Sequence, residues 1–325
     1  MRVSLGVLLL ITGCAGPRPG AVRLGVYPIL DAAPLHVASG LGYFAEEGVQ
    51  IETIEFNQGS KMMEALIAGD LDIVYDSVPQ AMAMRVRGQP VRAFLSGYQS
   101  ALSVLAASPK AAASLRELSG LAGKTIGVGS FGGFQHGLLL HLLRHARVPS
   151  TSVHIVTIGT GATAAAALEH GKVDAALVSG SSLRLLEQRV RGARILLDMR
   201  SAEQARAIFG VWPYPGGIGL LSTDSWLDKH GAGAAGLARA MRRAMDWIRS
   251  HTAEETYKHL PENFRSQDMA ADIGYLRTIT PLMSEDGRMP PGGPEAIQRM
   301  LSASIEQAAA VDPASMWTNR FLEER

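Results

Sequence analysis

The chain has 325 residues, of which 47% are hydrophobic and 19% are charged. This composition excludes an intrinsically disordered chain and allows two domains of ordinary size. The formal net charge of +1 at pH 7 gives no overall attraction to nucleic acid, so no nucleic-acid partner is expected.

The first 21 residues have the pattern of an export signal followed by a tether. Arg2 precedes a short apolar run, and small residues stand directly before Cys14, the only cysteine of the chain. This pattern resembles the bacterial lipobox, which implies cleavage before Cys14 and lipidation of its sulfur. We expect a signal peptide at 1–13, a lipid on Cys14 and a tether at 14–21. A secretory peptide with a chance cysteine is the alternative.

After residue 21 the chain alternates between predicted strands and helices. In the first half, strands are predicted at 22–26, 49–56, 71–75 and 91–96, with helices at 34–39, 61–68 and 79–87. Ser60 is expected to cap the helix that follows it. After a crossing strand at 98–108, strands at 124–128, 153–158 and 173–178 alternate with helices at 135–146 and 162–170. This alternation predicts α/β lobes with mostly parallel sheets flanked by helices.

An internal repeat organises the same region. Leu66, Gly69, Asp72 and Ser77 are matched by Leu168, Gly171, Asp174 and Ser179, each pair being 102 positions apart. Asp72 and Asp174 each follow a glycine by three positions, which favours a structural capping role over catalysis. The repeat therefore predicts two similar lobes with a ligand between them.

The rest of the chain predicts that the first lobe is discontinuous. A strand at 218–222 reads as a return crossing, and the segments after it are mostly helical. We expect one lobe to comprise 22–105 plus 218–325 and the other to comprise 106–217.

Candidate binding residues follow the predicted strands. Ligands of open α/β sheets bind beyond the carboxyl ends of the strands. The candidates are hydroxyl residues, glycines, aromatic residues, a glutamine and two aspartates, namely Tyr27, Asp31, Gln58, Gly59, Ser60, Asp76, Ser77, Ser130, Phe131, Gly132, Phe134, Thr160, Gly161, Ser179 and Tyr214. Turn or cap chemistry explains any one of them alone. Their occurrence at matching places in both halves favours a shared site.

Motifs for catalysis or a cofactor are incomplete. The segment 127–132 matches the dinucleotide fingerprint G-x-G-x-x-G, but the next strand ends without the acidic residue that would hold a ribose. Its glycine-rich loop still suits an oxyanion. His141 and His145 lie four apart but lack the H-E-x-x-H pattern of a zinc site. No cofactor, metal or catalytic residue is expected.

A series of motifs resembles the nitrate/sulfonate/taurine class of solute-binding proteins of ABC importers. These motifs lie, in order, at 34–38, 42–52, 65–72, 88–91, 121–128, 286–288 and 317–322. The resemblance implies a two-lobed periplasmic-binding fold of type II, a ligand enclosed between the lobes, partner permease and ATPase subunits, and no enzyme activity. The family is also similar to proteins that bind or make thiamine-precursor pyrimidines, although the cysteine cluster of the synthase is absent here.

The leading hypothesis is a monomeric, membrane-anchored binding protein for a small anionic or zwitterionic solute. Ser130, Gly132, Thr160 and Gly161 would donate to the anion from one lobe, and Gln58, Ser60 and Ser77 from the other. Asp31 or Asp76 would meet an amine, as in taurine or an aminopyrimidine. The absence of Arg or Lys in these loops argues against a bare anion such as nitrate. The alternatives are a pyrimidine-binding protein, an enzyme on the same scaffold, and a lipoprotein that binds only a partner protein.

Overall fold

The computed structural model describes residues 20–323, without the side chains of Ser181 and Arg184. The expectations for the signal peptide, for Cys14 and for most of the tether therefore lie outside the described residues. Within residues 20–323, no helix combines the length and the apolar character that a membrane span requires.

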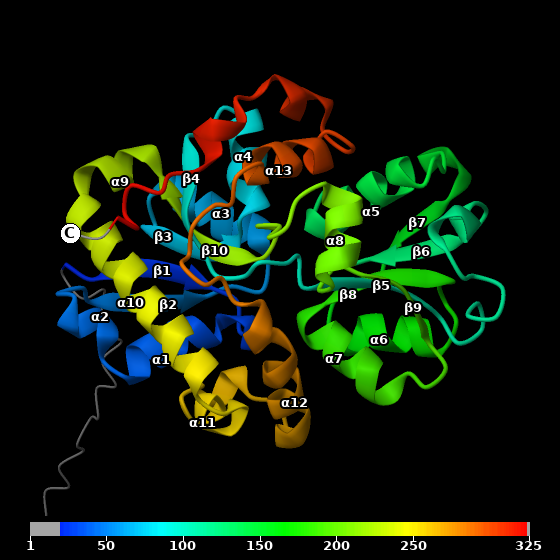
Figure 1. Cartoon of the computed structure of the whole chain (residues 1–325), viewed down its shortest axis with the longest axis horizontal. Coiled ribbons are helices and arrows are strands. Elements are labelled where there is room, and N and C mark those ends of the chain that lie inside the picture. Colours follow the sequence, from blue (N-terminus) through cyan, green and yellow to red (C-terminus); the bar gives the residue numbers. More distant parts are fainter. Residues whose placement is uncertain (1–19, 324–325) are drawn as a thin grey trace, which may run out of the picture.

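Two five-stranded sheets form the centres of two lobes, which lie side by side in Figure 1. The first sheet has the order β2-β1-β3-β10-β4 and contains β1 (Val22–Val26), β2 (Ile51–Glu55), β3 (Ile73–Ser77), β4 (Val91–Ser96) and β10 (Ile218–Thr223). The second has the order β7-β6-β8-β5-β9 and contains β5 (Ser103–Ala107), β6 (Thr125–Val128), β7 (His154–Thr157), β8 (Ala175–Ser179) and β9 (Arg194–Asp198). In each sheet the strand donated across the junction, β10 or β5, is antiparallel to both of its neighbours.

The predicted repeat is confirmed at the level of strand register. Leu24 pairs with Ile73 in the first sheet, and Ile126 pairs with Ala175 in the second, so both partners shift by the same offset. The central strands are apolar because helices cover both faces, and all five residues of β5 are buried. The α/β fold with two lobes is therefore as expected.

Helices flank both sheets. The first lobe carries α1 (Ala33–Gly40), α2 (Tyr43–Glu46), α3 (Gly59–Ala68) and α4 (Pro79–Val86), and the second carries α5 (Phe134–His145), α6 (Ala162–Glu169), α7 (Gly180–Arg189) and α8 (Ala202–Phe209). After β10 come α9 (Asp224–Lys229), α10 (Gly231–Ser250), α11 (Ala253–Lys258), α12 (Met269–Ile279) and α13 (Gly293–Leu301). Single 3₁₀ turns are η1 (Leu30–Ala32), η2 (Leu118–Leu121), η3 (Ser150–Ser152), η4 (Glu262–Phe264), η5 (Thr280–Leu282), η6 (Glu306–Ala310) and η7 (Pro313–Met316).

The helices after β10 pack on the first lobe, and two of them also reach the second. Helix α10 lies against α1 and α2, and α13 lies against α4. Helix α12 contacts α7, and α13 contacts α5, so both bridge the lobes below and above the middle of Figure 1. The first lobe is thus built from two separate parts of the chain.

Two crossing segments, residues 97–102 and 210–217, connect the lobes and touch each other. The backbone N–H of Tyr214 donates to the carbonyl of Gln99 at 2.9 Å. A Cβ at Gly217 would stand 2.7 Å from the carbonyl oxygen of Ser100, so a side chain there would force the crossings apart. The expected division at 105/106 falls inside β5, all of which pairs with the second sheet.

The expectation for Ser60 as a helix cap is wrong. Helix α3 begins at Gly59, Gln58 occupies the N-cap position, and no side chain caps the helix. The helix starts two residues earlier than predicted. The N–H of Met62 donates to the carbonyl of Gln58, so Ser60 lies within the first turn and not before it.

Candidate functional site

Three loops of the first lobe meet at the carboxyl ends of their strands. The Tyr27 hydroxyl, after β1, donates to Oδ2 of Asp76 at the end of β3, at 3.3 Å. A Cβ at Gly59, after β2, would stand 2.3 Å from the same hydroxyl. Gly59 therefore leaves the space that Tyr27 fills. The first lobe brings together three of the predicted residues, Tyr27, Gly59 and Asp76.

Asp31 lies where the first lobe meets the second. Its Oδ1 accepts from the hydroxyl of Tyr275 on α12, and its backbone carbonyl accepts from Tyr98 in the first crossing, both at 2.9 Å. Its Oδ2 would lie 3.4 Å from a Cβ at Gly180, the first residue of α7. The Asp31 side chain is thus fixed by a crossing and a bridging helix and faces the second lobe.

Among the side chains that the structure describes, three buried polar atoms at this edge of the sheet have no hydrogen-bond partner. They are Oδ2 of Asp31, the hydroxyl of Tyr75 and the hydroxyl of Ser77. Buried polar groups are bonded in the great majority of cases, because an unmade bond leaves the cost of removing the group from water uncompensated. The three atoms offer one carboxylate acceptor and two hydroxyls that can donate or accept. This combination suits a polar molecule with both donors and acceptors.

Burial shifts the ionisation of both aspartates. Loss of water raises the pKa of Asp31 to about 6, although the Tyr275 hydroxyl partly offsets the shift. Loss of water likewise raises the pKa of Asp76 to about 6, against the opposing bond from the Ser77 N–H. Near pH 7 both carboxylates carry charge in a setting that disfavours it. A cationic or hydrogen-donating group would relieve this cost.

The second lobe arranges its loops through Gln135. The Oε1 of Gln135 accepts from the N–H of Gly129 at 2.8 Å, and its Nε2 donates to the Ser179 hydroxyl at 3.1 Å. A Cβ at Gly129 would stand 3.5 Å from Cγ2 of Thr160. The loops after β6, β7 and β8 therefore meet as their counterparts do in the first lobe.

Two backbone donors that were expected to hold an anion are already occupied. The N–H of Gly132 donates to Nδ1 of His136 at 3.3 Å, and the N–H of Gly161 donates to the Ser182 hydroxyl at 2.6 Å. An anion would have to displace these side chains to use either N–H. The glycine-rich loop is therefore a weaker oxyanion site than its sequence indicates.

The remaining loop residues differ in exposure. Phe134 and Ser179 are half-buried, and Gln58, Ser60, Ser130 and Thr160 are exposed. Phe131 is 59% exposed and meets His136 edge-on. Phe134 packs against the core and Ser179 accepts from Gln135, whereas the exposed side chains are open to contact with a ligand.

The helices that follow the parallel strands share uncapped N-termini. Among the described side chains none caps α3, α5, α6 or α7, nor α1, α2, α4, α10 or α13, whereas Ser201, Thr223, Thr252 and Asp268 cap α8, α9, α11 and α12. Unbonded N–H groups and the positive end of the helix dipole favour an anion by about 0.3–1 kcal/mol at each end. This edge of both lobes therefore keeps some capacity for a negative group.

Tyr214 lies in the second crossing rather than in a strand-end loop. Its ring is fully buried and stacks on Phe209 with a centroid distance of 3.6 Å. Sequence reasoning missed Tyr75, Tyr98, Gln135 and Tyr275. Tyr75 directly precedes Asp76, which was a usable signal, but nothing local to Tyr275 indicates its contact with Asp31, 244 positions away.

A sequence model of the family described as NMT1/THI5 like matches residues 30–255, which is more than half of the chain. The chain belongs to the NMT1/THI5-like family. No curated protein matches it in a sequence search.

Solved structures similar to this NMT1/THI5-like chain share its fold over nearly its full length. A protein of Bordetella bronchiseptica RB50 is 28% identical with a TM-score of 0.81, and the match covers 93% of this chain and 96% of that one. The periplasmic aliphatic sulphonate binding protein SsuA from Escherichia coli is 20% identical with a TM-score of 0.72, covering 92% of each chain. The periplasmic nitrate-binding protein NrtA from Synechocystis PCC 6803 is 13% identical with a TM-score of 0.70, covering 93% and 87%. The fold is that of the two-lobed periplasmic binding proteins.

Proposed function

We propose that this chain is the extracytoplasmic solute-binding component of an ABC importer and that it holds a small polar solute between its lobes. Membership of the NMT1/THI5-like family and the fold shared with SsuA and NrtA support this role. The binding site comprises the strand-end loops of both lobes, with Tyr27, Asp31, Asp76 and Ser77 on one side. The protein carries out no reaction on the solute.

The environment of the Asp31 carboxylate decides which class of solute we propose. One of its oxygens is bonded to Tyr275, and the other is buried, has no partner among the described residues and faces α7 of the second lobe. Asp76 adds a second buried carboxylate nearby on the same sheet edge. Two negative charges repel a bare anion and attract an ammonium or amino group. The solute is therefore an amine-bearing zwitterion, such as taurine, or an aminopyrimidine.

The uncapped helices supply the complementary half of the site. A sulfonate or carboxylate group of a zwitterion would lie near the N-termini of α6 and α7, and its amine would lie near Asp31. Such a solute contacts both lobes only when they are together. It therefore stabilises the closed arrangement by differential contact, which is how a binding protein signals that it is loaded.

Location and partners follow from the N-terminal sequence. Cleavage before Cys14 and lipidation of its sulfur would anchor the folded part through a short tether on the outer side of the cytoplasmic membrane or in the periplasm. A monomer in this position would deliver its solute to a permease driven by an ATPase subunit.

A thermal-shift panel tests the proposal. Taurine, other aminosulfonates, aminopyrimidines, simple alkanesulfonates and nitrate are compared at equal ionic strength. Amine-bearing compounds should raise the melting temperature and nitrate should not, because a ligand bound only to the folded state stabilises it by mass action. Stabilisation by nitrate and alkanesulfonates alone would contradict the role of Asp31, and stabilisation by no compound would contradict solute capture of this class.

A further inference from the structure

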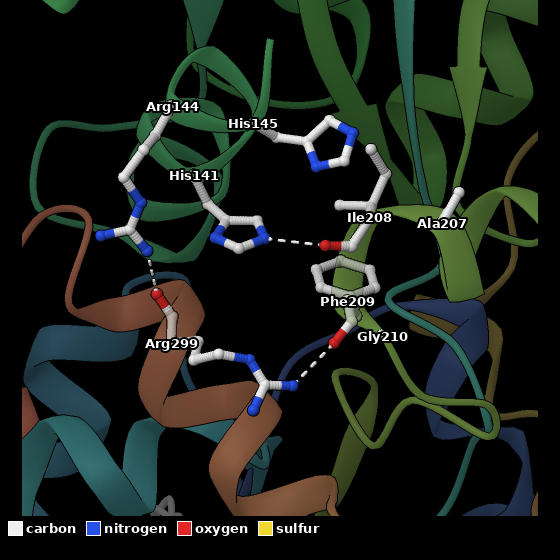
Figure 2. A pocket seen from close by; sticks show the side chains of 8 residues that line it. All are labelled: His141, Arg144, His145, Ala207, Ile208, Phe209, Gly210 and Arg299. Carbon is white, nitrogen blue, oxygen red and sulfur yellow. Dashed lines mark hydrogen bonds between the residues drawn. The ribbon is translucent and has the colours of Figure 1, made fainter. Parts of the chain in front are cut away.

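A pocket lies outside the strand-end loops, where α5 and α8 of the second lobe meet α13. Its volume is about 360 Å³. Figure 2 shows its lining, which consists of His141, Arg144, His145, Ala207, Ile208, Phe209, Gly210 and Arg299. Four of these residues are basic and none is acidic. The pocket thus collects positive charge, although the chain as a whole is almost neutral.

The two arginines are only partly engaged. Nη2 of Arg144 donates to the carbonyl of Arg299 at 2.5 Å, and Nη2 of Arg299 donates to the carbonyl of Phe209 at 2.9 Å. A guanidinium has five N–H donors, so most donors of both side chains remain available. Neither arginine forms an ion pair with any carboxylate among residues 20–323. Each arginine donates to a carbonyl near the carboxyl end of a helix, α13 for Arg144 and α8 for Arg299, which accounts for one bond of each side chain.

His141 contributes a buried polar atom. Its side chain is 8% exposed, its ring stacks on Phe209, and its Nε2 lies 3.2 Å from the carbonyl of Ile208. That bond requires the proton on Nε2. Its Nδ1 is buried and has no hydrogen-bond partner within the described part of the chain. In Figure 2 the His141 ring lies between the Arg144 and Arg299 side chains.

We propose that this pocket binds a multivalent oxyanion, which is inorganic phosphate, a phosphate monoester or a polycarboxylate. Two guanidinium groups present planar forks that fit paired oxygen atoms, and the strength of such charge-assisted bonds exceeds that of neutral ones. Burial lowers the pKa of His141, so its neutral ring offers Nδ1 as an acceptor for a protonated oxygen of the anion. The repulsion between the two guanidinium groups is relieved when the anion is bound.

The position of this pocket links the anion to the relative placement of the lobes. Arg144 belongs to the second lobe, whereas Arg299 lies on α13, which packs against α4 of the first. Phe209 forms part of the pocket and stacks on Tyr214 of the second crossing. An anion held by both arginines therefore favours the arrangement seen here. By thermodynamic linkage it raises the affinity for a solute that binds the same arrangement.

Calorimetric titration with sodium phosphate, against sodium chloride at equal ionic strength, tests the site. The full folded protein should bind one phosphate, and Arg144→Gln combined with Arg299→Gln should weaken binding by about tenfold or more. The matched control is Arg206→Gln, an exposed arginine of α8 outside the pocket, which should bind phosphate as the parent does. Circular dichroism establishes that each variant is folded.

Two further arms separate this site from the interlobe site. Excess taurine should not displace phosphate, because none of the strand-end residues lines this pocket. A phosphate monoester and citrate distinguish the sources of the oxyanion. Equal binding by the parent and the double arginine variant would overturn the proposal, as would failure of phosphate, the monoester and citrate alike to bind the parent. Neither result would affect the proposal for solute capture.

Discussion

Asp31 and Gly180 oppose each other across the junction between the lobes. Oδ2 of Asp31 would lie 3.4 Å from a Cβ at Gly180, whose backbone has a φ of +53°. The glycine permits this left-handed conformation and lets the start of α7 approach the carboxylate closely. A charge on one lobe thus faces a helix N-terminus on the other, and a solute placed here contacts both.

Replacing Asp31 by asparagine should separate solute binding from stability. The substitution keeps the shape but removes the charge, so affinity for an amine-bearing solute should fall by about 10- to 100-fold, as expected for a charged hydrogen bond worth about 1.5–3 kcal/mol. Without solute, the variant should be more stable at pH 8 because a buried charge is removed. Calorimetry and urea unfolding measure the two effects. Asp70→Asn, at an exposed position before β3, is the control and should change neither.

The pH dependence should have opposite signs for stability and binding. The folded-state pKa values of Asp31 and Asp76 are about 6, above the value of 3.8 expected when unfolded. Between about pH 4 and pH 6 the folded state therefore binds more protons than the unfolded state. The contribution of the two groups to the free energy of unfolding is fully present below pH 4 and is lost as the pH rises through 6. Solute affinity should instead fall below pH 6, as the carboxylates lose their charge. Affinity that stays constant from pH 5 to 8 would argue against a charged contact.

Gly59 and Tyr27 should show strong coupling. Alanine at Gly59 would place Cβ 2.3 Å from the Tyr27 hydroxyl, so Gly59→Ala should destabilise the protein by about 1–3 kcal/mol and weaken solute binding. Tyr27→Phe removes the clashing atom. The double variant should therefore be less destabilised than the sum of the single ones, as a double-mutant cycle by urea unfolding will measure. Additive effects would mean that the helix moves instead of the tyrosine.

The repeated aspartates should matter for stability alone. Asp72 accepts from the N–H of Arg23 at 2.8 Å, and Asp174 accepts from the N–H of Thr125 at 2.9 Å, so they tie the starts of β3 and β8 to β1 and β6 respectively. Asp72 also binds the Arg23 guanidinium. Asp72→Ala should destabilise by about 1–3 kcal/mol and more than Asp174→Ala, with solute affinity unchanged in both. A large loss of affinity in either folded variant would contradict a purely structural role.

The two lobes could be predicted from the sequence because the same strand and helix pattern occurs in both copies of the repeat. The offset of 102 positions between the Gly-x-x-Asp segments also relates the strand pairings of the two sheets. The register is preserved because a shift of one residue would turn every apolar side chain of a strand to the opposite face of the sheet. The expectation that Asp72 and Asp174 cap their own turns is wrong, because both side chains accept from the backbone of a neighbouring strand.

The loops of the candidate site could be predicted from the sequence, but the contacts among their side chains could not. The ends of strands are marked by local sequence patterns, so Asp31 and Asp76 could be selected as candidates from the sequence. The contacts of Tyr275 and Tyr98 with Asp31 depend on how distant segments pack, and both residues read as ordinary core aromatics. The sequence does not show that the side chain of His136 accepts from the N–H of Gly132 in the glycine-rich loop. Nor does it show that Ser182 accepts from the N–H of Gly161 in the loop after β7.

A structure determined with taurine or an aminopyrimidine bound tests the central claim most directly. We expect the amine or amino group within hydrogen-bond distance of Oδ2 of Asp31 or of the Asp76 carboxylate, with the rest of the solute touching loops of the second lobe. A solute found away from both carboxylates, or one that contacts a single lobe, would contradict the account.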